Sequence, residues 1–247
     1  MTSLWRPPCP CDVRCLHAAP AQVGAFTALG RALSAAGVLL LGTLRPAGSG
    51  RLARSLLRAM GIRWSVVGAP LRPGSLLAGN HVSWLDIVVM MAIDDRIRLV
   101  SKVEVGDWPV IGRMARASGT IFVDRSRPRS LPGTVAEVTA ALRKGDLVQV
   151  FPEGTTTCGA HPARWRPAFL QAAVDAQAPV QRFTLLFSTA AAAFVEGENL
   201  LQSLRRVLRV RGLSVTVLVD EPQRADAGRR QLALRLSPKR LVALGGR

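Results

Sequence analysis

The sequence predicts an α/β fold, in which a mixed, mostly parallel sheet is flanked by helices and preceded by an apolar, membrane-associating N-terminal helix. The chain has 247 residues and 49% of them are apolar, which is enough for one full hydrophobic core. From about Gly68 onward, short apolar runs alternate with longer segments of helical periodicity, a pattern typical of a sheet covered by helices. Before that point, residues 22–44 carry almost no charge.

The first twenty residues are predicted to be a flexible tail. They hold three of the four cysteines of the chain: Cys9, Cys11 and Cys15. The tail lacks the continuous apolar stretch of a signal peptide, and with only Cys158 elsewhere the chain cannot be a disulfide scaffold. The cysteines and His17 could be read as metal ligands. No second ligand pair at zinc-finger spacing follows, so no metal site is predicted.

Residues 21–66 are predicted to form a helical segment that associates with a membrane. Residues 22–44 contain one charge, Arg31, and as a helix would be about 34 Å long, close to the length that crosses a bilayer. The apolar run between Arg31 and Arg45 is short for a span, so both spanning and lying in the interface stay open. Arginines and leucines then alternate at near-helical spacing up to Arg63, which predicts a basic amphipathic helix; a surface helix packed on the domain is the alternative.

The charge balance indicates an anionic partner. Lys and Arg number 33 against 16 Asp and Glu, a formal net charge of +17, which suits either nucleic acid or an anionic membrane surface. A basic helix beside an apolar one favours the membrane, because each cation gains about 1 kcal/mol near anionic headgroups. No aromatic stacking platform, zinc finger or recognition-helix pattern accompanies the arginines, so a nucleic-acid partner is not expected.

The remaining residues, 67–247, are predicted to form one domain. Six apolar runs are predicted as strands, at residues 75–78, 97–100, 120–123, 147–151, 180–185 and 213–219. Six periodic segments are predicted as helices, at residues 84–93, 108–117, 132–143, 167–176, 200–210 and 229–244.

A histidine and an aspartate follow the first of these strands. His81 and Asp86 are five residues apart, so on a continuous helix they would lie about 140° apart, and they need a turn between them. Ser83 is predicted to cap the next helix, which puts Asp86 in its first turn, within reach of the imidazole. A carboxylate on one ring nitrogen leaves the other free to take a proton from a hydroxyl. The alternative is a plain helix cap beside an incidental loop histidine.

Four segments resemble, in order, the motif blocks of the glycerolipid and lysophospholipid acyltransferase family. They are Asn80-His81-Val82-Ser83-Trp84-Leu85-Asp86 (a His-x-x-x-x-Asp block), Gly119-Thr120-Ile121-Phe122-Val123-Asp124-Arg125, Phe151-Pro152-Glu153-Gly154-Thr155 and Ala178-Pro179-Val180. One block would be a weak signal, but four in the family's order are specific. The resemblance covers roughly residues 68–219, and many members also carry an N-terminal membrane helix. It identifies residues 67–247 as an acyltransferase domain.

The resemblance implies catalytic and acceptor-binding residues. His81 would be the general base that activates the acceptor hydroxyl, with Asp86 orienting it, and no acyl-enzyme would form. Arg125 would hold a phosphate through its planar fork of donors, although an ion pair with Asp124 is the ordinary alternative for an isolated arginine. The acceptor pocket would further include residues of the same blocks and a lysine after another strand: Asn80, Ser83, Lys102, Phe122, Glu153, Gly154 and Thr155. Lys102 could equally be a solvated surface lysine.

The implied activity is transfer of an acyl chain from acyl-CoA or acyl carrier protein, as co-substrate and with no other cofactor, to a lysophospholipid. The first candidate acceptor is 1-acyl-sn-glycerol-3-phosphate, giving phosphatidic acid, on the cytoplasmic face of the inner or plasma membrane. The segment after the third block, residues 164–169, and the one after the fourth, residues 181–183, depart from the family's pattern. A lyso-aminolipid or glycolipid acceptor therefore stays open. From another class, a non-catalytic basic membrane or nucleic-acid binding protein with the same fold is the alternative.

Overall fold

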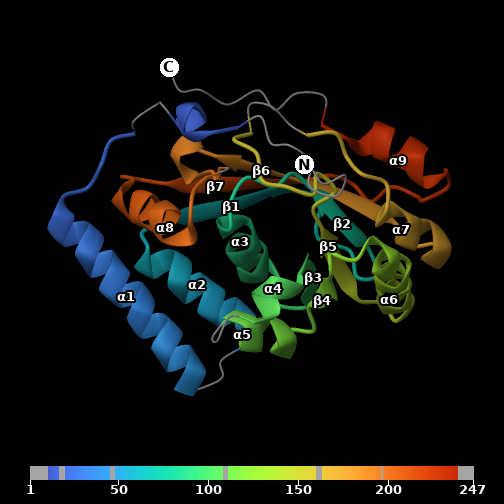
Figure 1. Ribbon diagram of the computed structural model, residues 1–247, viewed down its shortest axis with the longest axis horizontal. Coiled ribbons are helices and arrows are strands. Elements are labelled where there is room, and N and C mark those ends of the chain that lie inside the picture. Colours follow the sequence, from blue (N-terminus) through green and yellow to red (C-terminus); the bar gives the residue numbers. More distant parts are fainter. Residues whose placement is uncertain are drawn as a thin grey trace.

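A computed structural model describes residues 11–16, 20–44, 48–107, 111–159, 163–195 and 197–238 of the chain. Its centre is one seven-stranded sheet with helices on both faces (Figure 1). The order of the strands across the sheet is β1-β7-β6-β2-β5-β3-β4. Their bounds are β1 Arg63–Gly68, β2 Leu76–Gly79, β3 Ile97–Lys102, β4 Ile121–Val123, β5 Leu147–Val150, β6 Val180–Phe187 and β7 Ser214–Val219.

The sheet is mixed and mostly parallel, which confirms the predicted fold class. The five strands from β6 to β4 run parallel to one another, whereas β7 is antiparallel to β6 and β1 is parallel to β7. Leu76 of β2 lies opposite Val148 of β5 on one side and Val180 of β6 on the other. The segments that follow these parallel strands therefore leave the sheet at one shared edge.

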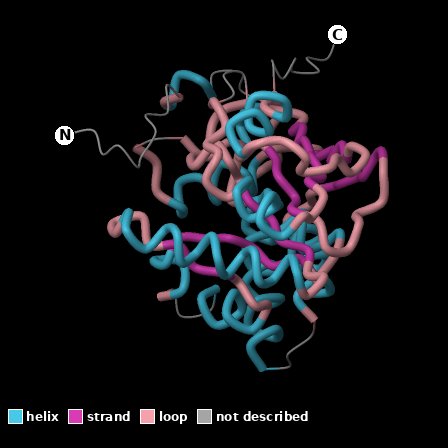
Figure 2. The backbone as a smooth tube through the Cα atoms, turned by 90° about the vertical axis from the view of Figure 1, so that its right-hand side faces the viewer, coloured by secondary structure: helices cyan, strands magenta, loops and turns pink. Residues whose placement is uncertain are grey.

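The helices divide between the two faces of the sheet (Figures 1 and 2). The α-helices of the described residues are α1 Ala25–Leu44, α2 Ser49–Ala59, α3 Leu85–Ile93, α4 Val103–Gly106, α5 Ile111–Ala117, α6 Leu131–Arg143, α7 Leu170–Ala176, α8 Leu200–Arg209 and α9 Arg229–Leu236. On one face α2 contacts α3, and α1 contacts α2 and α8. On the other face α7 contacts α6 and α9.

Each face has its own apolar core. On the first face α3 packs Leu85, Val89 and Met90 against the sheet with no exposed surface, which explains why this short apolar segment forms a helix. On the second face Val138 of α6 and Leu170 of α7 are fully buried over the central strands. Full burial of such a side chain contributes about 1.5–3 kcal/mol to the stability of the fold. The two cores therefore hold the sheet firmly from both faces.

The structure adds one strand that the sequence did not predict. Residues 63–66 were assigned to the membrane-associating segment, but they belong to β1, which pairs with β7 at the edge of the sheet. Gly61 ends α2 by adopting a φ of +71°, a backbone conformation that glycine adopts without strain. In β1 only Trp64 is even partly buried, so the strand lacks the apolar alternation by which a strand is recognised.

The other predicted elements differ from the structure mainly at their ends. Of the helix predicted at residues 108–117, the structure has α5 at Ile111–Ala117, and residues 108–110 lie outside the described residues. The short helix α4, which precedes it at Val103–Gly106, was not predicted. The helix predicted at 167–176 begins three residues later, at Leu170. The helix predicted at 229–244 ends at Leu236 within the described part of the chain, which stops at residue 238.

The apolar N-terminal helix α1 runs along the outside of the domain (Figure 1). It is the one described helix that is long and apolar enough to cross a membrane, and almost none of that stretch is buried. Phe26 is 91% exposed and Leu33 64% exposed. Its single charge, Arg31, instead faces the domain, where Nη1 donates 2.9 Å hydrogen bonds to the carbonyl oxygens of Leu208 and Val210. The outer face of α1 is therefore an apolar strip without charge.

The predicted basic amphipathic helix is α2. It buries Leu52 and Leu57 against the domain and exposes Arg51 and Arg58. Arg54, also exposed, donates a 2.7 Å hydrogen bond to the carbonyl oxygen of Ala92 at the end of α3. The helix is thus both amphipathic and packed on the domain, with a row of cations beside the apolar strip of α1.

Candidate active site

The predicted site residues follow parallel strands at the shared carboxyl edge of the sheet. His81 follows β2, Glu153 and Gly154 follow β5, and Arg125 follows β4. Since β2 and β5 are hydrogen-bonded neighbours, the first two of these segments lie side by side. Open α/β sheets bind their ligands at this edge, because the loops there are positioned by the rigid strands beneath them.

His81 and Asp86 form the predicted pair. The Nδ1 atom of His81 lies 2.8 Å from Oδ2 of Asp86. The same carboxylate oxygen accepts the backbone N–H groups of Val82 at 2.6 Å and Ser83 at 2.9 Å. The Asp86 side chain is fully buried, whereas that of His81 is 19% exposed. The carboxylate therefore fixes the proton on Nδ1 and leaves the Nε2 lone pair directed away from it.

The turn between the two residues differs in detail from the prediction. The helix α3 begins at Leu85 with Trp84 as its N-cap, and no side chain caps it. The hydroxyl of Ser83 accepts a 3.3 Å hydrogen bond from the N–H of Leu85, rather than capping the helix as predicted. Asp86 still lies in the first turn, because its N–H donates to the Ser83 carbonyl at 3.1 Å, so the expected geometry of the pair survives.

The imidazole ring is held by one aromatic side chain, Phe151, which is backed by a second, Phe183, and the sequence alone predicted no role for either. His81 stacks on Phe151 with ring centroids 4.0 Å apart and planes at 12°. Phe151 in turn contacts the ring of Phe183 edge-on, at 6.0 Å. A Cβ atom on Gly79 would lie 2.3 Å from the Phe183 ring, so a glycine is required there. The sequence offered one signal that Phe151 belongs to the site: its place in the third motif block, at the end of a predicted strand.

Glu153 lies beneath the loop between β2 and α3, residues 80–84, which carries His81. Its Oε2 accepts a hydrogen bond from the backbone N–H of His81 at 3.3 Å, and the side chain has no exposed surface. Among the described residues Oε1 has no hydrogen-bond partner. Burial raises the pKa of Glu153 to about 8, the His81 N–H lowers it, and the nearby charge of Asp86 raises it further. Glu153 thus supports the backbone of His81, and its expected place in the acceptor pocket stays a prediction.

Arg125 is joined to the third motif block. Its Nη1 donates a 2.8 Å hydrogen bond to the carbonyl oxygen of Gly154, which has a φ of +73°. The neighbouring Asp124, the alternative partner considered for Arg125, accepts hydrogen bonds from the N–H and hydroxyl of Ser126, and these lower its pKa. The structure thus brings together Arg125 and Gly154, two residues predicted to bind the acceptor; that binding stays a prediction.

Two residues predicted to bind substrate, Asn80 and Ser83, make hydrogen bonds that hold the fold. Both amide atoms of Asn80 bond to the backbone of Leu185: Oδ1 accepts at 2.8 Å and Nδ2 donates at 3.0 Å. Ser83 is fully buried, and its hydroxyl is engaged with the turn. Each side chain thus satisfies backbone groups of the fold. The substrate-binding roles of Asn80 and Ser83 stay predictions.

The remaining predicted binding residues lie near the same edge. Lys102 is exposed at the end of β3, and in the register it pairs with Val123 of β4. Phe122 of β4 is half-buried, and its ring packs close to Gly106. Thr155 follows Gly154 and is half-buried. Their roles in binding stay predictions.

The chain is similar to known acyltransferases. A family model described as acyltransferase matches residues 63–185, which include every predicted site residue. A 1-acyl-sn-glycerol-3-phosphate acyltransferase from Neisseria meningitidis is 37% identical over 138 residues, which cover 55% of this chain and 54% of that protein. A second such enzyme, from Neisseria gonorrhoeae, is covered to 47%, so the matched part spans about half the length of these two relatives.

A longer match and a solved structure extend these similarities. A lyso-ornithine lipid O-acyltransferase from Pseudomonas aeruginosa is 33% identical over 196 residues, 74% of each chain. The crystal structure of the 1-acyl-sn-glycerophosphate acyltransferase PlsC from Thermotoga maritima superposes with a TM-score of 0.59, covering 85% of this chain and 90% of that one. At 16% identity, this second likeness concerns the fold.

Proposed function

The chain belongs to the acyltransferase family, and from this premise we propose that it acylates the hydroxyl of a lysophospholipid, with 1-acyl-sn-glycerol-3-phosphate as the acceptor and phosphatidic acid as the product. The donor is an acyl thioester, acyl-CoA or acyl carrier protein, and no further cofactor takes part. One observation carries the proposal: the His81–Asp86 pair, 2.8 Å apart at the carboxyl edge of the sheet. It fits a reaction whose main requirement is removal of a proton from a hydroxyl.

In the proposed reaction His81 acts as general base and then as general acid. Its Nε2 takes the proton of the acceptor hydroxyl as the oxygen attacks the thioester carbonyl carbon. The C–S bond then breaks, and the thiol carrier leaves with the proton returned from the imidazolium. Asp86 stabilises that imidazolium, and the stack on Phe151 keeps the ring in its orientation.

Arg125 is proposed to bind the phosphate of the acceptor. The hydrogen bond to the Gly154 carbonyl orients the guanidinium at the edge where His81 lies. A planar fork of donors matches a phosphate better than a point charge does. Lys102 is the nearest proposed contributor of further positive charge, from the exposed end of β3.

The apolar strip of α1 and the arginines of α2 are proposed to bind the anionic cytoplasmic surface of the inner or plasma membrane, where the thioester donors are available. Double replacement Leu33→Ser with Leu40→Ser, both in the exposed strip, should reduce co-sedimentation with anionic vesicles. The matched control Ala35→Ser lies on the buried side of the same helix and should leave vesicle binding in place. Equal binding by the double variant and the control would contradict this role.

The deciding experiment for the activity is thiol release from both donor types, with and without acceptor, by wild type and His81→Ala. We expect acceptor-dependent release that falls by about 10²–10⁴-fold in the variant, while its circular dichroism stays unchanged. Full activity in His81→Ala would refute the general-base role. Absence of release with either donor would favour the non-catalytic membrane-binding alternative.

A second acceptor, lyso-ornithine lipid, is favoured by the longer match to the Pseudomonas relative. The two acceptors differ in their headgroups, since only 1-acyl-sn-glycerol-3-phosphate carries a phosphate. Arg125→Ala should therefore raise KM for the phosphate-bearing acceptor more than for lyso-ornithine lipid. An equal effect on both would contradict phosphate binding by Arg125, and the higher kcat/KM of the wild type identifies the preferred acceptor.

A further inference from the structure

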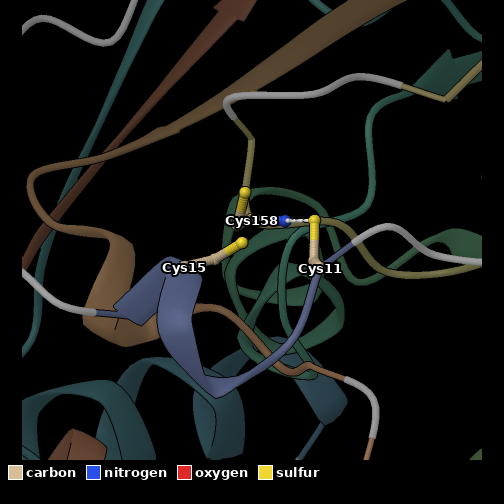
Figure 3. Close-up of side chains that lie close together, drawn as sticks. All are labelled: Cys11, Cys15 and Cys158. Atoms are coloured by element: carbon tan, nitrogen blue, oxygen red, sulfur yellow. Dashed lines mark hydrogen bonds between the residues drawn. The ribbon is translucent and has the colours of Figure 1, made fainter.

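Three cysteine sulfurs from distant parts of the sequence meet (Figure 3). They lie beside Val82, in the loop that carries His81. Cys11 and Cys15 flank the start of the short 3-10 helix η1, Val13–Leu16, and Cys158 follows the third motif block. All three Sγ atoms lie within 4.8 Å of one another. Residues 1–20 are predicted to be a flexible tail, whereas Cys11 of that tail is only 1% exposed.

The spacing of the sulfurs suits a small thiophilic metal ion. Cys-x-x-x-Cys is a usual ligand spacing for structural zinc, and the chain between Cys11 and Cys15 turns tightly, with the N–H of Cys15 donating to the Asp12 carbonyl at 3.0 Å. In a tetrahedral site with Zn–S bonds of about 2.3 Å, neighbouring sulfurs lie about 3.8 Å apart. The sulfurs would need to approach one another by about 1 Å at most to reach that geometry.

The surroundings of the sulfurs also fit a thiolate-rich site. Cys158 donates its backbone N–H to the Sγ of Cys11 at 3.2 Å, and such N–H···S hydrogen bonds stabilise thiolate ligands. The apolar side chains of Val82 and Val195 enclose the cluster and limit water access. Cys15 is half-buried, which leaves a path by which an ion can enter.

We propose that Cys11, Cys15 and Cys158 bind a zinc ion that joins the N-terminal segment to the loop after β5, which contacts His81. Sulfur ligands select zinc over the harder cations magnesium and calcium, and three thiolates complete most of a tetrahedral shell. The fourth ligand is a water molecule or a further side chain. Each thiol gives up its proton on binding, so zinc binding strengthens as the pH rises.

The position of the ion gives it a role in the proposed reaction. The N–H of Thr157, one residue before Cys158, donates to the His81 carbonyl at 2.8 Å. Val82, the residue after His81, packs in the same cluster as Cys11 and Cys158. A metal bond to Cys158 would therefore hold both segments on which His81 depends. This effect on catalysis rests on the proposed function, but metal binding does not.

Two simpler explanations must be distinguished from zinc binding. Buried cysteines are often only small apolar residues of a core. Two of the three sulfurs could also pair as a disulfide, which the reducing cytoplasm disfavours. The convergence of three sulfurs distinguishes the cluster from simple packing, because apolar packing alone does not favour placing three sulfur atoms next to one another.

The test uses the full chain, purified after expression with zinc and again after chelation. We expect one zinc per chain by elemental analysis, a lower Tm after chelation that zinc restores, and, with cobalt in its place, the absorption bands of tetrahedral thiolate coordination. Metal content and spectra do not depend on acyl transfer, so this test is separate from that of the proposed function.

Two variants assign the ligands. Cys15→Ser should weaken zinc binding by at least about 100-fold. Replacing a residue that only hydrogen-bonds to a metal ligand already lowers metal affinity by about 10–100-fold. Cys15→His, which keeps a zinc ligand at a half-buried position, should restore stoichiometric zinc. Three results would each overturn the proposal. The wild type could lack zinc after expression with the metal, or Cys15→Ser could hold as much zinc as the wild type. The third is a disulfide among these cysteines in the purified native chain.

Discussion

Two loops meet beside His81, one after β2 and one after β5, and each leads to a fully buried acid. Asp86, reached from the β2 loop, accepts three hydrogen bonds on Oδ2, from the imidazole and from two backbone N–H groups. Glu153, in the β5 loop, accepts one at 3.3 Å, and burial raises its pKa to about 8. Equal burial is therefore met differently: Asp86 is satisfied by three hydrogen bonds on one oxygen, whereas burial of Glu153 favours its protonated form.

The largest expected effect is a loss of activity on changing Asp86, the acid reached from the β2 loop. Asp86→Asn should lower kcat by about 10²–10⁴-fold, because the amide no longer stabilises the imidazolium or selects the Nδ1–H tautomer. Steady-state thiol release measures it. Glu153→Gln, the matched acid-to-amide change in the other loop, should cost much less activity. Similar losses in both variants would remove the distinction between the two acids.

The next effect is the pH dependence of stability caused by Glu153. Its pKa is about 8 in the folded chain against an ordinary value of 4.5, so between these values the folded state binds more protons than the unfolded state. The free energy of unfolding should fall as the pH rises from 4.5 to 8, by up to about 1.4 kcal/mol per pH unit. Urea unfolding of wild type and Glu153→Gln at several pH values tests this: parallel pH profiles would contradict it.

Asn80 allows a test of how the β2 loop itself is held. In Asn80→Ala the buried N–H and C=O of Leu185 lose their side-chain partner, which should cost about 1–3 kcal/mol of stability. Denaturant unfolding gives the value. If Asn80 contacted substrate instead, the variant would unfold like the wild type and show its defect in the acceptor KM.

The smallest expected effect concerns the aromatic contact between the two loops. Phe151→Leu removes the ring on which His81 stacks, a contact of about 0.5–1.5 kcal/mol, and should lower kcat several-fold. Phe183→Leu, which changes only the ring behind it, should alter kcat less. A larger loss in Phe183→Leu would show that packing of the whole cluster, rather than the stack, orients the imidazole.

The sequence predicted those parts of the site that depend on neighbours along the chain. His81 and Asp86 are five residues apart and separated by one turn, so their pairing follows from local geometry. The position of Glu153 under His81 depends on β2 and β5 lying side by side, and the two residues are 72 positions apart in sequence. No local pattern along the chain records that contact.

The same distinction explains the fold. The strands from β2 to β7 carry enough buried apolar residues to be recognised, whereas β1 is exposed along most of its length and follows a helix with similar arginine spacing. The cysteine cluster joins positions 147 residues apart, and only the folded chain brings them together. Periodicity predicts elements, but it does not predict which distant elements touch.

The edge position of β1 has a consequence for the order of events during synthesis. Ser65 of β1 contacts Thr216 of β7, which follows 151 residues later. At about 5–20 residues per second, a ribosome needs roughly 8–30 s to cover that distance. The apolar strip of α1 emerges well before the partner strand of β1 exists. On the proposed membrane role of α1, the nascent chain would reach a lipid surface while its sheet is still open, so that docking would precede completion of the fold.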